Sequence, residues 1–308
     1  MKKNKKRYIW FNLLSFLLVL IILSGGIYLH NIYRSFASAT QQMHAGVTWE
    51  KSDKRASELR FEKEEPFSVL LLGVDEREDD GGRSDTMIVV TVNPETETTK
   101  LLSIPRDTYV EIAGRDTMDK INHAYAFGGV DMTIKTVENY LDIPIDYFIQ
   151  INMDGFMDIV NAISGISVVN EFAFKTGGFY FPAGMIDLTG EEALAYARMR
   201  YEDPDGDFGR QQRQRQVIEA VLRKAVSFHS LLSVNEFFEA VGSNIKTNLK
   251  VDEIIDIQSK YRPALNNFNE ESLAGGNELY INDIYYYDVP EPVLTSVKAQ
   301  LHKELELE

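Results

Sequence analysis

The sequence predicts a layered α-β-α domain, an α/β fold with a central mixed sheet, preceded by one N-terminal transmembrane helix. Three observations support this class. Phe67–Val74 (FSVLLLGV) is a nearly continuous apolar run, which is typical of a strand buried on both faces. The predicted strands and helices alternate after it, so helices can cover both sides of the sheet. Upstream, Tyr8–Leu29 is apolar and uncharged over a length that crosses a bilayer.

Five basic residues stand before this apolar run, and aromatic residues lie near its two ends. The positive-inside rule therefore predicts a single-pass protein of the cell membrane. Its expected order is a cytoplasmic tail over 1–7, an anchor over 8–29, a stalk over 30–65 and an extracytoplasmic domain over 66–308. A cleaved signal peptide is the alternative, because the Ala-Ser-Ala triplet at 37–39 has the spacing of a cleavage site. The length of the run favours an uncleaved anchor.

The chain carries a formal net charge of −15 and no cysteine. Because five of its basic residues lie in the N-terminal tail, the remainder is more acidic still, and such a surface repels nucleic acid. A large domain without disulfides must rely on its own core, and the 44% hydrophobic composition is ample for one. An extracytoplasmic domain of this kind suits a Gram-positive cell surface.

Turn residues separate the predicted strands. The turn around Asn93-Pro94 joins two of them, and glycines punctuate a hairpin or loop over Phe172–Phe181. Asn266–Gly276 is predicted to be a flexible loop. The strands expected after the first are Thr86–Val92, Thr99–Ile104, Ile145–Met153, Ile166–Val169 and Tyr280–Val289.

Apolar residues that recur every three or four positions predict the helices. A capping box formed by Thr189 and Glu192 begins one helix, and the stripe from Val217 to Ala225 predicts the next. The predicted helices are 130–141, Asp154–Ile163, 189–197, Arg210–Ser227, one after Ser233, Val251–Tyr261 and Pro292–Leu307.

Five arginines and no lysine lie between Arg198 and Arg215, in a chain that is otherwise acidic. Arginine presents a planar fork that binds phosphate or carboxylate with two hydrogen bonds, so the stretch indicates an anion site. Helical phase continues the inward face through Arg210, Arg213 and Gln214, whereas Gln211, Gln212, Arg215, Glu219 and Arg223 are predicted to lie elsewhere. A salt-bridge network with the acidic turn at 203–207 is the alternative.

Acidic residues flank the loop after the first strand. Asp75 ends that strand and Asp85 begins the next, so both carboxylates can meet at one edge of the sheet. Paired carboxylates without cysteine or histidine nearby suit Mg²⁺, especially when phosphate oxygens share the ion. Loop capping is the alternative, and spacing alone favours it. Arg106 ends another strand and can reach the same rim, and Lys120 lies in a polar cluster nearby.

Four blocks, in this order, resemble the LytR–CpsA–Psr family. They are LLGVDER with GRSD (Leu71–Arg77, Arg83–Asp85), SIPRD (Ser103–Asp107), KINHAYAFGG (Lys120–Gly129) and ALAYARMRYEDPDGDFGRQQRQRQ (Ala193–Gln216). The resemblance extends from about Pro66 to the C-terminus and is closest to the teichoic-acid transferase branch. It implies an α-β-α fold with a deep apolar groove for a polyprenyl chain.

The resemblance also implies a phosphotransferase. Such an enzyme moves an anionic glycopolymer, wall teichoic acid, from an undecaprenyl-pyrophosphate carrier in the membrane to peptidoglycan. The implied cofactor is Mg²⁺ or Mn²⁺, held by Asp75 and Asp85. The implied catalytic residues are Arg106, Arg198, Arg200, Arg210 and Asp207, the last as candidate general base. Candidate substrate-binding residues are Arg83, Lys120, Arg213 and Gln214.

Three alternative functions were considered. A polyprenyl-pyrophosphate hydrolase would use water as the nucleophile, and a non-catalytic module would bind the lipid-linked glycan without turnover. A transcription attenuator conflicts with the predicted anchor and with the acidic domain.

Overall fold

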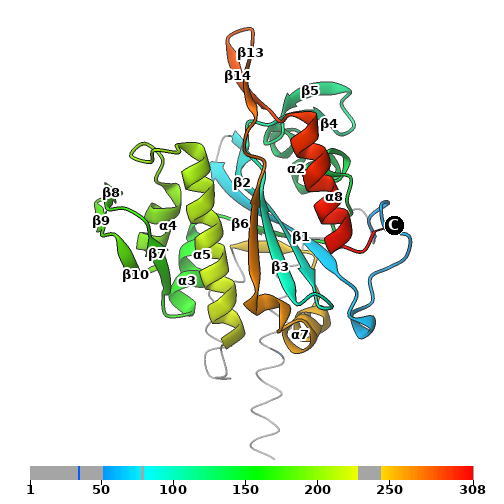
Figure 1. Ribbon diagram of the computed structural model, residues 1–308, viewed down its shortest axis with the longest axis horizontal. Coiled ribbons are helices and arrows are strands. Elements are labelled where there is room, and N and C mark those ends of the chain that lie inside the picture. The colour runs from blue at the N-terminus through cyan, green and yellow to red at the C-terminus, as the bar shows by residue number, and fades with distance from the viewer. Residues whose placement is uncertain (1–33, 35–50, 78–79, 228–243, 308) are drawn as a thin grey trace, which may run out of the picture.

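The structure is a computed structural model that describes residues 34, 51–77, 80–227 and 244–307. Its centre is a six-stranded mixed sheet in the order β11-β6-β1-β2-β3-β12 (Figure 1). The central strand β1 runs parallel to β6 and antiparallel to β2. The strands of this sheet are β1 (Phe67–Arg77), β2 (Asp80–Asn93), β3 (Thr98–Ser103), β6 (Tyr147–Ile151), β11 (Ile245–Thr247) and β12 (Phe268–Ser272). The predicted mixed sheet is confirmed.

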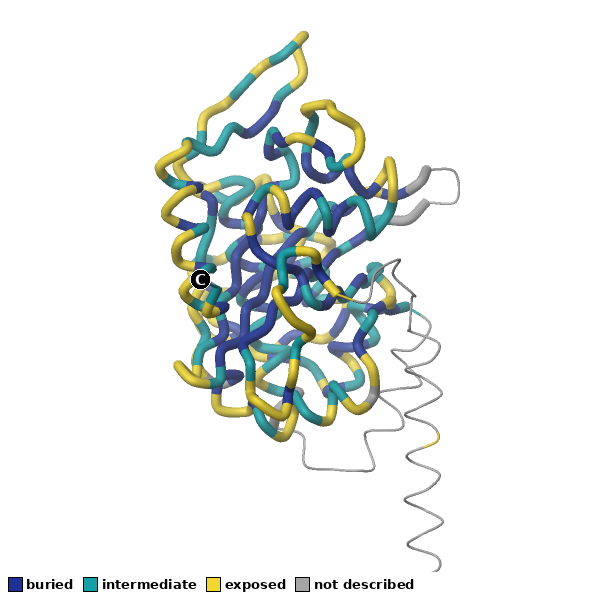
Figure 2. The backbone as a smooth tube through the Cα atoms, turned by 90° about the vertical axis from the view of Figure 1, so that its right-hand side faces the viewer, coloured by how far each residue is buried: buried dark blue, intermediate teal, exposed yellow. Residues whose placement is uncertain are grey.

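Helices cover both faces of the sheet. On one face, α2 (His123–Leu141) and α8 (Glu291–Glu304) bury Leu70, Leu72 and Val74 of β1. On the other face, α5 (Asp207–Ser227) and α7 (Val251–Lys260) pack against the residues of β1 that alternate with these, as expected for a strand buried on both sides. Figure 2 shows the buried backbone concentrated in these central strands. The layers are therefore α-β-α.

A second apolar cluster lies beside the sheet, on the left of Figure 1. It is built around Val160, Tyr196 and Val217, which are nearly inaccessible to solvent. The helix α5 lies between this cluster and the main sheet, so it has two buried sides. The elements of the cluster are α3 (Met153–Ala162), α4 (Gly190–Arg198), β7 (Ile166–Asn170), β8 (Phe174–Thr176), β9 (Phe179–Phe181) and β10 (Gly184–Leu188), with α5.

The predicted strand Tyr280–Val289 is wrong: this segment contributes to a hairpin of β13 (Asn277–Ile281) and β14 (Ile284–Asp288). The two residues between them, Asn282 and Asp283, have φ angles of 52° and 62°. Asn and Asp tolerate this left-handed backbone and form two-residue hairpin turns. The sequence pattern resembles one continuous strand because aromatic residues lie on both sides of the turn.

The predicted flexible loop Asn266–Gly276 is also wrong in its first half. Phe268–Ser272 forms β12, which pairs in parallel with β3 at the edge of the sheet. Its polar composition is that of an edge strand with one solvated side. Two helices begin earlier than predicted: α2 at His123, with a kink at Gly128 and Gly129, and α5 at Asp207.

Part of the predicted stalk packs on the domain. Arg55 donates two hydrogen bonds to Asp146, of 2.8 and 2.7 Å, and the ring of Phe61 stacks 6.0 Å from that of Tyr147. The packed structure therefore begins upstream of residue 66. The predicted anchor over 8–29 and the helix predicted after Ser233 lie outside the described residues. Within the described ranges, no helix combines the length and the apolar character needed to cross a membrane.

Candidate active site

Predicted site residues from three parts of the chain meet at the upper end of the sheet in Figure 1. Arg106 follows β3, and its Nη1 donates to Oδ1 of Asp85 on β2 at 2.9 Å. Asp85 lies on a β-bulge, because the register passes from Gly73–Thr86 to Val74–Ser84 and leaves it without an opposite residue. A bulge re-aims a side chain, and here it turns the carboxylate towards the loop after β3.

The third part is the first turn of α5. Oδ1 of Asp207 lies 2.6 Å from Nη2 of Arg210 and 3.7 Å from Nε of Arg200, which stands in the loop between α4 and α5. Gln211 donates to the other oxygen of Asp207 at 3.0 Å. A carboxylate is favourable in the first turn of a helix, whereas an arginine there opposes the helix dipole. Asp207 thus compensates for the unfavourable position of Arg210.

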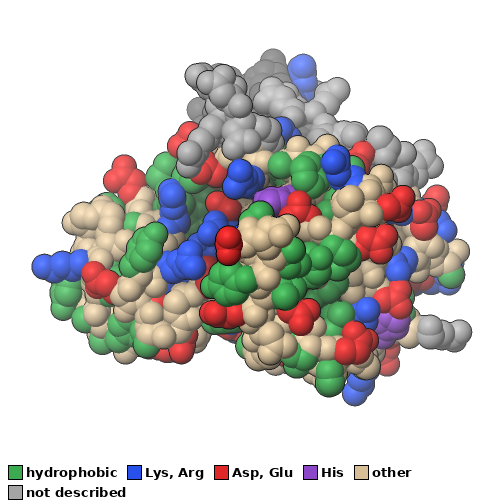
Figure 3. Space-filling view, turned by 90° about the horizontal axis from the view of Figure 1, so that it is seen from above, with side chains coloured by type: hydrophobic (Ala, Val, Ile, Leu, Met, Phe, Trp, Pro, Cys, Tyr) green, Lys and Arg blue, Asp and Glu red, His purple; other side chains and the backbone are tan. Residues whose placement is uncertain are grey.

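These groups share one electrostatic environment. Burial lowers the pKa of Arg210, Asp207 acts against that, and the positive charges of Arg106 and Arg200 lower it further. Burial also works against the charge on Arg106, but the nearby carboxylates, Asp85 foremost, raise its pKa overall. Arg106 thus forms an ion pair with Asp85 on the sheet and is also influenced electrostatically by Asp207 on the helix. Figure 3 looks down on this end of the molecule, where basic and acidic side chains gather beside hydrophobic ones.

Two buried atoms of this cluster are not satisfied. Nε of Arg210 and Oδ1 of Asp207 have no hydrogen-bond partner among the described residues, since the close contact of Oδ1 with Arg210 is an ion pair without hydrogen-bond alignment. Buried polar atoms in native proteins are nearly always paired. The cations of Arg106, Lys120, Arg200 and Arg210 form ion pairs with three carboxylates, those of Asp85, Asp107 and Asp207, so an added anion would balance the charge. The arrangement fits a phosphate-bearing ligand.

Lys120 extends the cluster towards the β13–β14 hairpin. Its Nζ lies 2.7 Å from Oδ1 of Asp107, whose Oδ2 is 3.7 Å from Nε of Arg106. Lys120 ends β5 (Thr117–Lys120), which pairs with β4 (Tyr109–Ile112). Asp107 was not among the predicted site residues, although it stands in the SIPRD block and directly follows Arg106.

Asp75 and Asp85 are diagonal neighbours on adjacent strands, because Asp75 lies opposite Arg83 in the β1–β2 register. The strands continue past both residues to Arg77 and from Asp80, so neither aspartate stands at a strand end as predicted. No group of three or more acidic or histidine side chains with metal-binding geometry occurs in the described ranges. A Mg²⁺ ion that also binds substrate phosphates usually has only one or two carboxylate ligands from the protein. Asp75 and Asp85 therefore fit the implied ion.

Arg213 is buried on the inward face of α5, as helical phase predicts, and its contacts are with the loop between α4 and α5. Its side chain is 6% exposed, forms an ion pair with Asp203, and donates to the backbone carbonyls of Tyr196 and Met199 at 3.2 and 2.6 Å. Its guanidinium also lies 5.5 Å from the centre of the Phe174 ring. These contacts fix the loop between α4 and α5, so the structure gives Arg213 a supporting role behind the cluster.

The remaining predicted residues stand on β2, α4 and α5. Arg198 is exposed at the end of α4, where Nη1 meets Sδ of Met153 at 3.0 Å. Arg83 is exposed on the β1–β2 hairpin, and Gln214 is half-buried one helical turn after Arg210. Arg215 was predicted to lie off the inward face but is 7% exposed; it donates to Glu270 and to Ser103, each at 2.9 Å.

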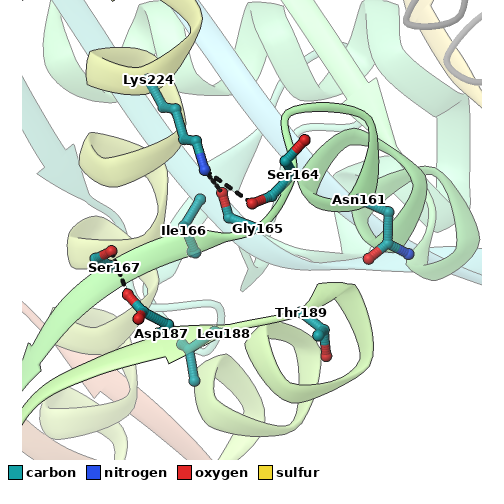
Figure 4. A pocket seen from close by; sticks show the side chains of 9 residues that line it. All are labelled: Asn161, Ser164, Gly165, Ile166, Ser167, Asp187, Leu188, Thr189 and Lys224. Carbon is teal, nitrogen blue, oxygen red and sulfur yellow. Dashed lines mark hydrogen bonds between the residues drawn. The ribbon is translucent and has the colours of Figure 1, made fainter.

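A cavity of about 570 Å³ lies at the other end of α5. Figure 4 shows Lys224 pointing to the backbone of 164–165, where it donates to two carbonyls at 2.9 and 2.5 Å. Ser167 donates to Asp187 on the facing strand. Lys224 follows Arg210 by about 21 Å of helix at 1.5 Å per residue. This cavity is separate from the arginine cluster, and these polar groups bind one another.

The model of the LytR_cpsA_psr family matches residues 29–303. The chain belongs to the LytR–CpsA–Psr family. This confirms the resemblance carried by the four sequence blocks.

Curated relatives of this LytR–CpsA–Psr chain match it nearly from end to end. A polyisoprenyl-teichoic acid–peptidoglycan teichoic acid transferase TagU from Bacillus licheniformis is 47% identical over 304 residues, which are 99% of this chain and 98% of the relative. The protein of the same name from Bacillus subtilis is 46% identical over 305 residues, with coverage of 99% and 98%.

Solved structures of the family share the fold. TagU from B. subtilis is 47% identical with a TM-score of 0.64, covering 79% of this chain and 98% of that one. TagT bound to LIIa-WTA is 36% identical with a TM-score of 0.74, covering 86% and 100%. A protein from Enterococcus faecalis described as a transcriptional regulator is 44% identical with a TM-score of 0.75, covering 82% and 92%.

Proposed function

We propose that this chain is a teichoic acid transferase that moves wall teichoic acid from undecaprenyl pyrophosphate to peptidoglycan. The observation that carries the proposal is the cluster of Arg106, Arg200 and Arg210, in which a buried guanidinium nitrogen has no partner among the described residues. The names of the curated relatives support the same activity. We further propose that residues 8–29 anchor the protein in the cell membrane, which would keep the site close to the lipid carrier.

The reaction exchanges one phosphorus–oxygen bond for another. A sugar hydroxyl of peptidoglycan attacks the phosphorus that carries the polymer. The bond from that phosphorus to the bridging oxygen breaks, and undecaprenyl phosphate leaves. In a loose transition state negative charge spreads over the phosphoryl oxygens, and positioned cations supply most of the catalysis. The proposed cations are the guanidinium groups of Arg106, Arg200 and Arg210.

Asp207 is better suited to hold these arginines than to accept the proton. It is paired with both Arg200 and Arg210, and Gln211 occupies its second oxygen. In a loose transition state the attacking hydroxyl keeps most of its proton until late, so the proton can leave to water. We therefore propose Asp207 as a positioning residue, in place of the general base suggested from the sequence.

Asp75 and Asp85 are proposed to hold Mg²⁺, or Mn²⁺ in its place. The bound ion would supply charge neutralisation at the phosphate oxygens. Arg106 donates to one oxygen of Asp85, which fixes the orientation of that carboxylate.

The deciding experiment uses the full-length protein in detergent with lipid-linked teichoic acid, with and without peptidoglycan. Appearance of polymer covalently bound to peptidoglycan supports the proposal. Release of free polymer at the same rate with or without peptidoglycan would instead identify a pyrophosphatase. Binding without turnover would identify a non-catalytic glycan-binding module.

A second experiment tests the proposed topology. Protease added to intact protoplasts is expected to remove the domain beyond residue 36. A domain that is digested only after lysis would lie in the cytoplasm, where a transcription attenuator would act.

A further inference from the structure

The β13–β14 hairpin projects from the same end of the molecule as the arginine cluster (Figure 1). Tyr280 and Tyr285 face each other across its two strands, with ring centres 5.6 Å apart. Tyr280 is 62% exposed. Ile284, next to Tyr285 in the sequence, is also 50% exposed, and neighbouring apolar groups left in solvent commonly mark an interaction surface.

One face of this hairpin leads to the active site. Tyr280, Tyr285 and Tyr287 lie on the same face, because opposite residues and alternate residues of a strand share a side. At the base, the ring of Tyr287 meets that of Phe208 at 5.6 Å, and Phe208 directly follows Asp207 on α5. The tyrosine face is therefore continuous with the first turn of α5.

Charged groups of the site lie beside the hairpin. Nζ of Lys120 lies 5.9 Å from the centre of the Tyr285 ring and 5.7 Å from that of Tyr286, which is on the other face. Burial raises the pKa of the Tyr285 hydroxyl, and the carboxylates of Asp107, Glu278 and Asp207 raise it further. Tyr285 thus stands between the arginine cluster and the exposed ring of Tyr280.

The base of the hairpin holds this face in place. The Tyr287 hydroxyl donates to the Leu273 carbonyl at 2.6 Å and accepts from the Gly276 N–H at 2.7 Å. A Cβ at Gly276 would lie 2.3 Å from the Tyr287 ring, so only glycine permits this approach. The aromatic face is anchored at its lower end.

We propose that the Tyr280–Tyr285 face binds the uncharged amino-sugar backbone of the acceptor glycan and leads its hydroxyl to the arginine cluster. The inference rests on the proposed transferase activity, which requires a glycan acceptor beside the phosphate site. A tyrosine ring offers an apolar face for sugar C–H groups and a polar edge for their hydroxyls. The arrangement suits a chain of pyranose rings that runs along the hairpin.

The charge of the hairpin favours the neutral acceptor glycan over the anionic donor polymer and the membrane as its ligand. The hairpin 277–288 carries three acidic residues, Glu278, Asp283 and Asp288, and no lysine or arginine. Such a surface repels both the anionic teichoic acid and an anionic lipid surface. A neutral glycan pays no such electrostatic cost. Charge thus favours the acceptor over the donor polymer and the membrane.

The test compares the full-length protein with Tyr280→Ala, Tyr280→Phe and the control Tyr180→Ala. Tyr180 lies on β9 and is 60% exposed, so it matches Tyr280 in exposure but stands on another part of the fold. The probe is an N-acetylglucosamine tetrasaccharide, titrated in detergent without donor. Tyr280→Ala is expected to raise its Kd about tenfold, which corresponds to about 1.4 kcal/mol. Tyr180→Ala is expected to bind like the wild type. Tyr280→Phe keeps the ring face but loses the hydroxyl, so its Kd is expected to lie between those of the wild type and Tyr280→Ala.

Transfer kinetics give the second readout. Tyr280→Ala is expected to raise KM for peptidoglycan about tenfold and to leave KM for the lipid-linked donor unchanged. Unchanged Kd and acceptor KM in a folded Tyr280→Ala protein would overturn the proposal. So would a raised KM for the lipid-linked donor with tetrasaccharide binding intact, since that result assigns the hairpin to the donor. A wild type that binds the tetrasaccharide through Tyr280 but transfers no polymer would refute only the proposed transferase activity.

Discussion

Arg210 and Asp207 lie one helical turn apart on α5, with Nη2 of the arginine 2.6 Å from Oδ1 of the aspartate. The arginine side chain is 13% exposed and occupies the end of a helix where the dipole disfavours a cation. Asp207 offsets that penalty but leaves Nε of Arg210 without a hydrogen bond among the described residues. We infer that the pair is arranged to receive a further anion.

Arg210→Lys is expected to weaken transfer. Lysine keeps the charge but loses the planar two-pronged donor, so one charge-assisted hydrogen bond to the phosphate is lost. The loss of such a bond is worth roughly 1.5–3 kcal/mol, or about one to two decades in kcat/KM. Transfer kinetics with lipid-linked polymer measure the effect.

Arg223→Lys is the matched control for this variant. Arg223 stands on the same helix, is 45% exposed and pairs with Glu219, far from the cluster. We expect wild-type kinetics from it and wild-type thermal melts from both variants. An Arg210→Lys protein that is stable and fully active would show that Arg210 serves only its ion pair with Asp207.

Removal of divalent metal is expected to abolish transfer, and Mg²⁺ or Mn²⁺ should restore it. Asp75→Asn and Asp85→Asn should each weaken Mn²⁺ binding, which titration calorimetry measures independently of turnover. The physical reason is that each carboxylate supplies a hard, charged oxygen that an amide replaces poorly. Full activity after exhaustive chelation would assign the two aspartates to the hairpin structure or to direct contact with substrate.

Apolar periodicity predicted the elements of the core well, because burial alone determines where Leu70, Ile134 and Val217 lie. The same signal could not separate Arg210 from Arg213, since residues three apart share a helical face. The fold of the loop between α4 and α5 decides between them, by bringing Asp203 to Arg213. That is a tertiary contact without a periodic signature.

The burial of Arg215 was missed for a related reason. A helix with one apolar stripe is predicted to have one buried side, but α5 is covered on two. The second side is polar and is satisfied by Ser103 and Glu270, the latter on an edge strand that the sequence presented as a loop. Polar residues that pair with distant polar residues give no hydrophobic signal. The β13–β14 hairpin was missed for a different reason, because its turn residues, Asn282 and Asp283, interrupt an otherwise apolar and aromatic segment.

Arg213→Ala is expected to destabilise the fold. Arg213 and Asp203 are 6% and 2% exposed in their side chains, so the substitution leaves a buried carboxylate without its partner. Removal of one member of a buried ion pair typically costs roughly 3–5 kcal/mol. In a domain of this size that corresponds to a fall in Tm of roughly 6–20 °C. Differential scanning calorimetry with Arg223→Ala as the exposed control measures it, and equal melting of the two variants would contradict the supporting role of Arg213.

Gly209→Ala is expected to destabilise the protein through the same aspartate. Gly209 lies in the first turn of α5, where replacing glycine by alanine normally stabilises a helix by about 1 kcal/mol. Here the added Cβ would lie 2.1 Å from Oδ2 of Asp203, which is buried and held by Arg213. The carboxylate must therefore move, and its ion pair is broken. Because both substitutions act on this one contact, Gly209→Ala combined with Arg213→Ala should cost less than the sum of the single changes. Urea unfolding of the wild type, the two single variants and the double variant measures this coupling. Additive costs, or an ordinary stabilisation by Gly209→Ala, would show that Asp203 does not join the loop to the helix.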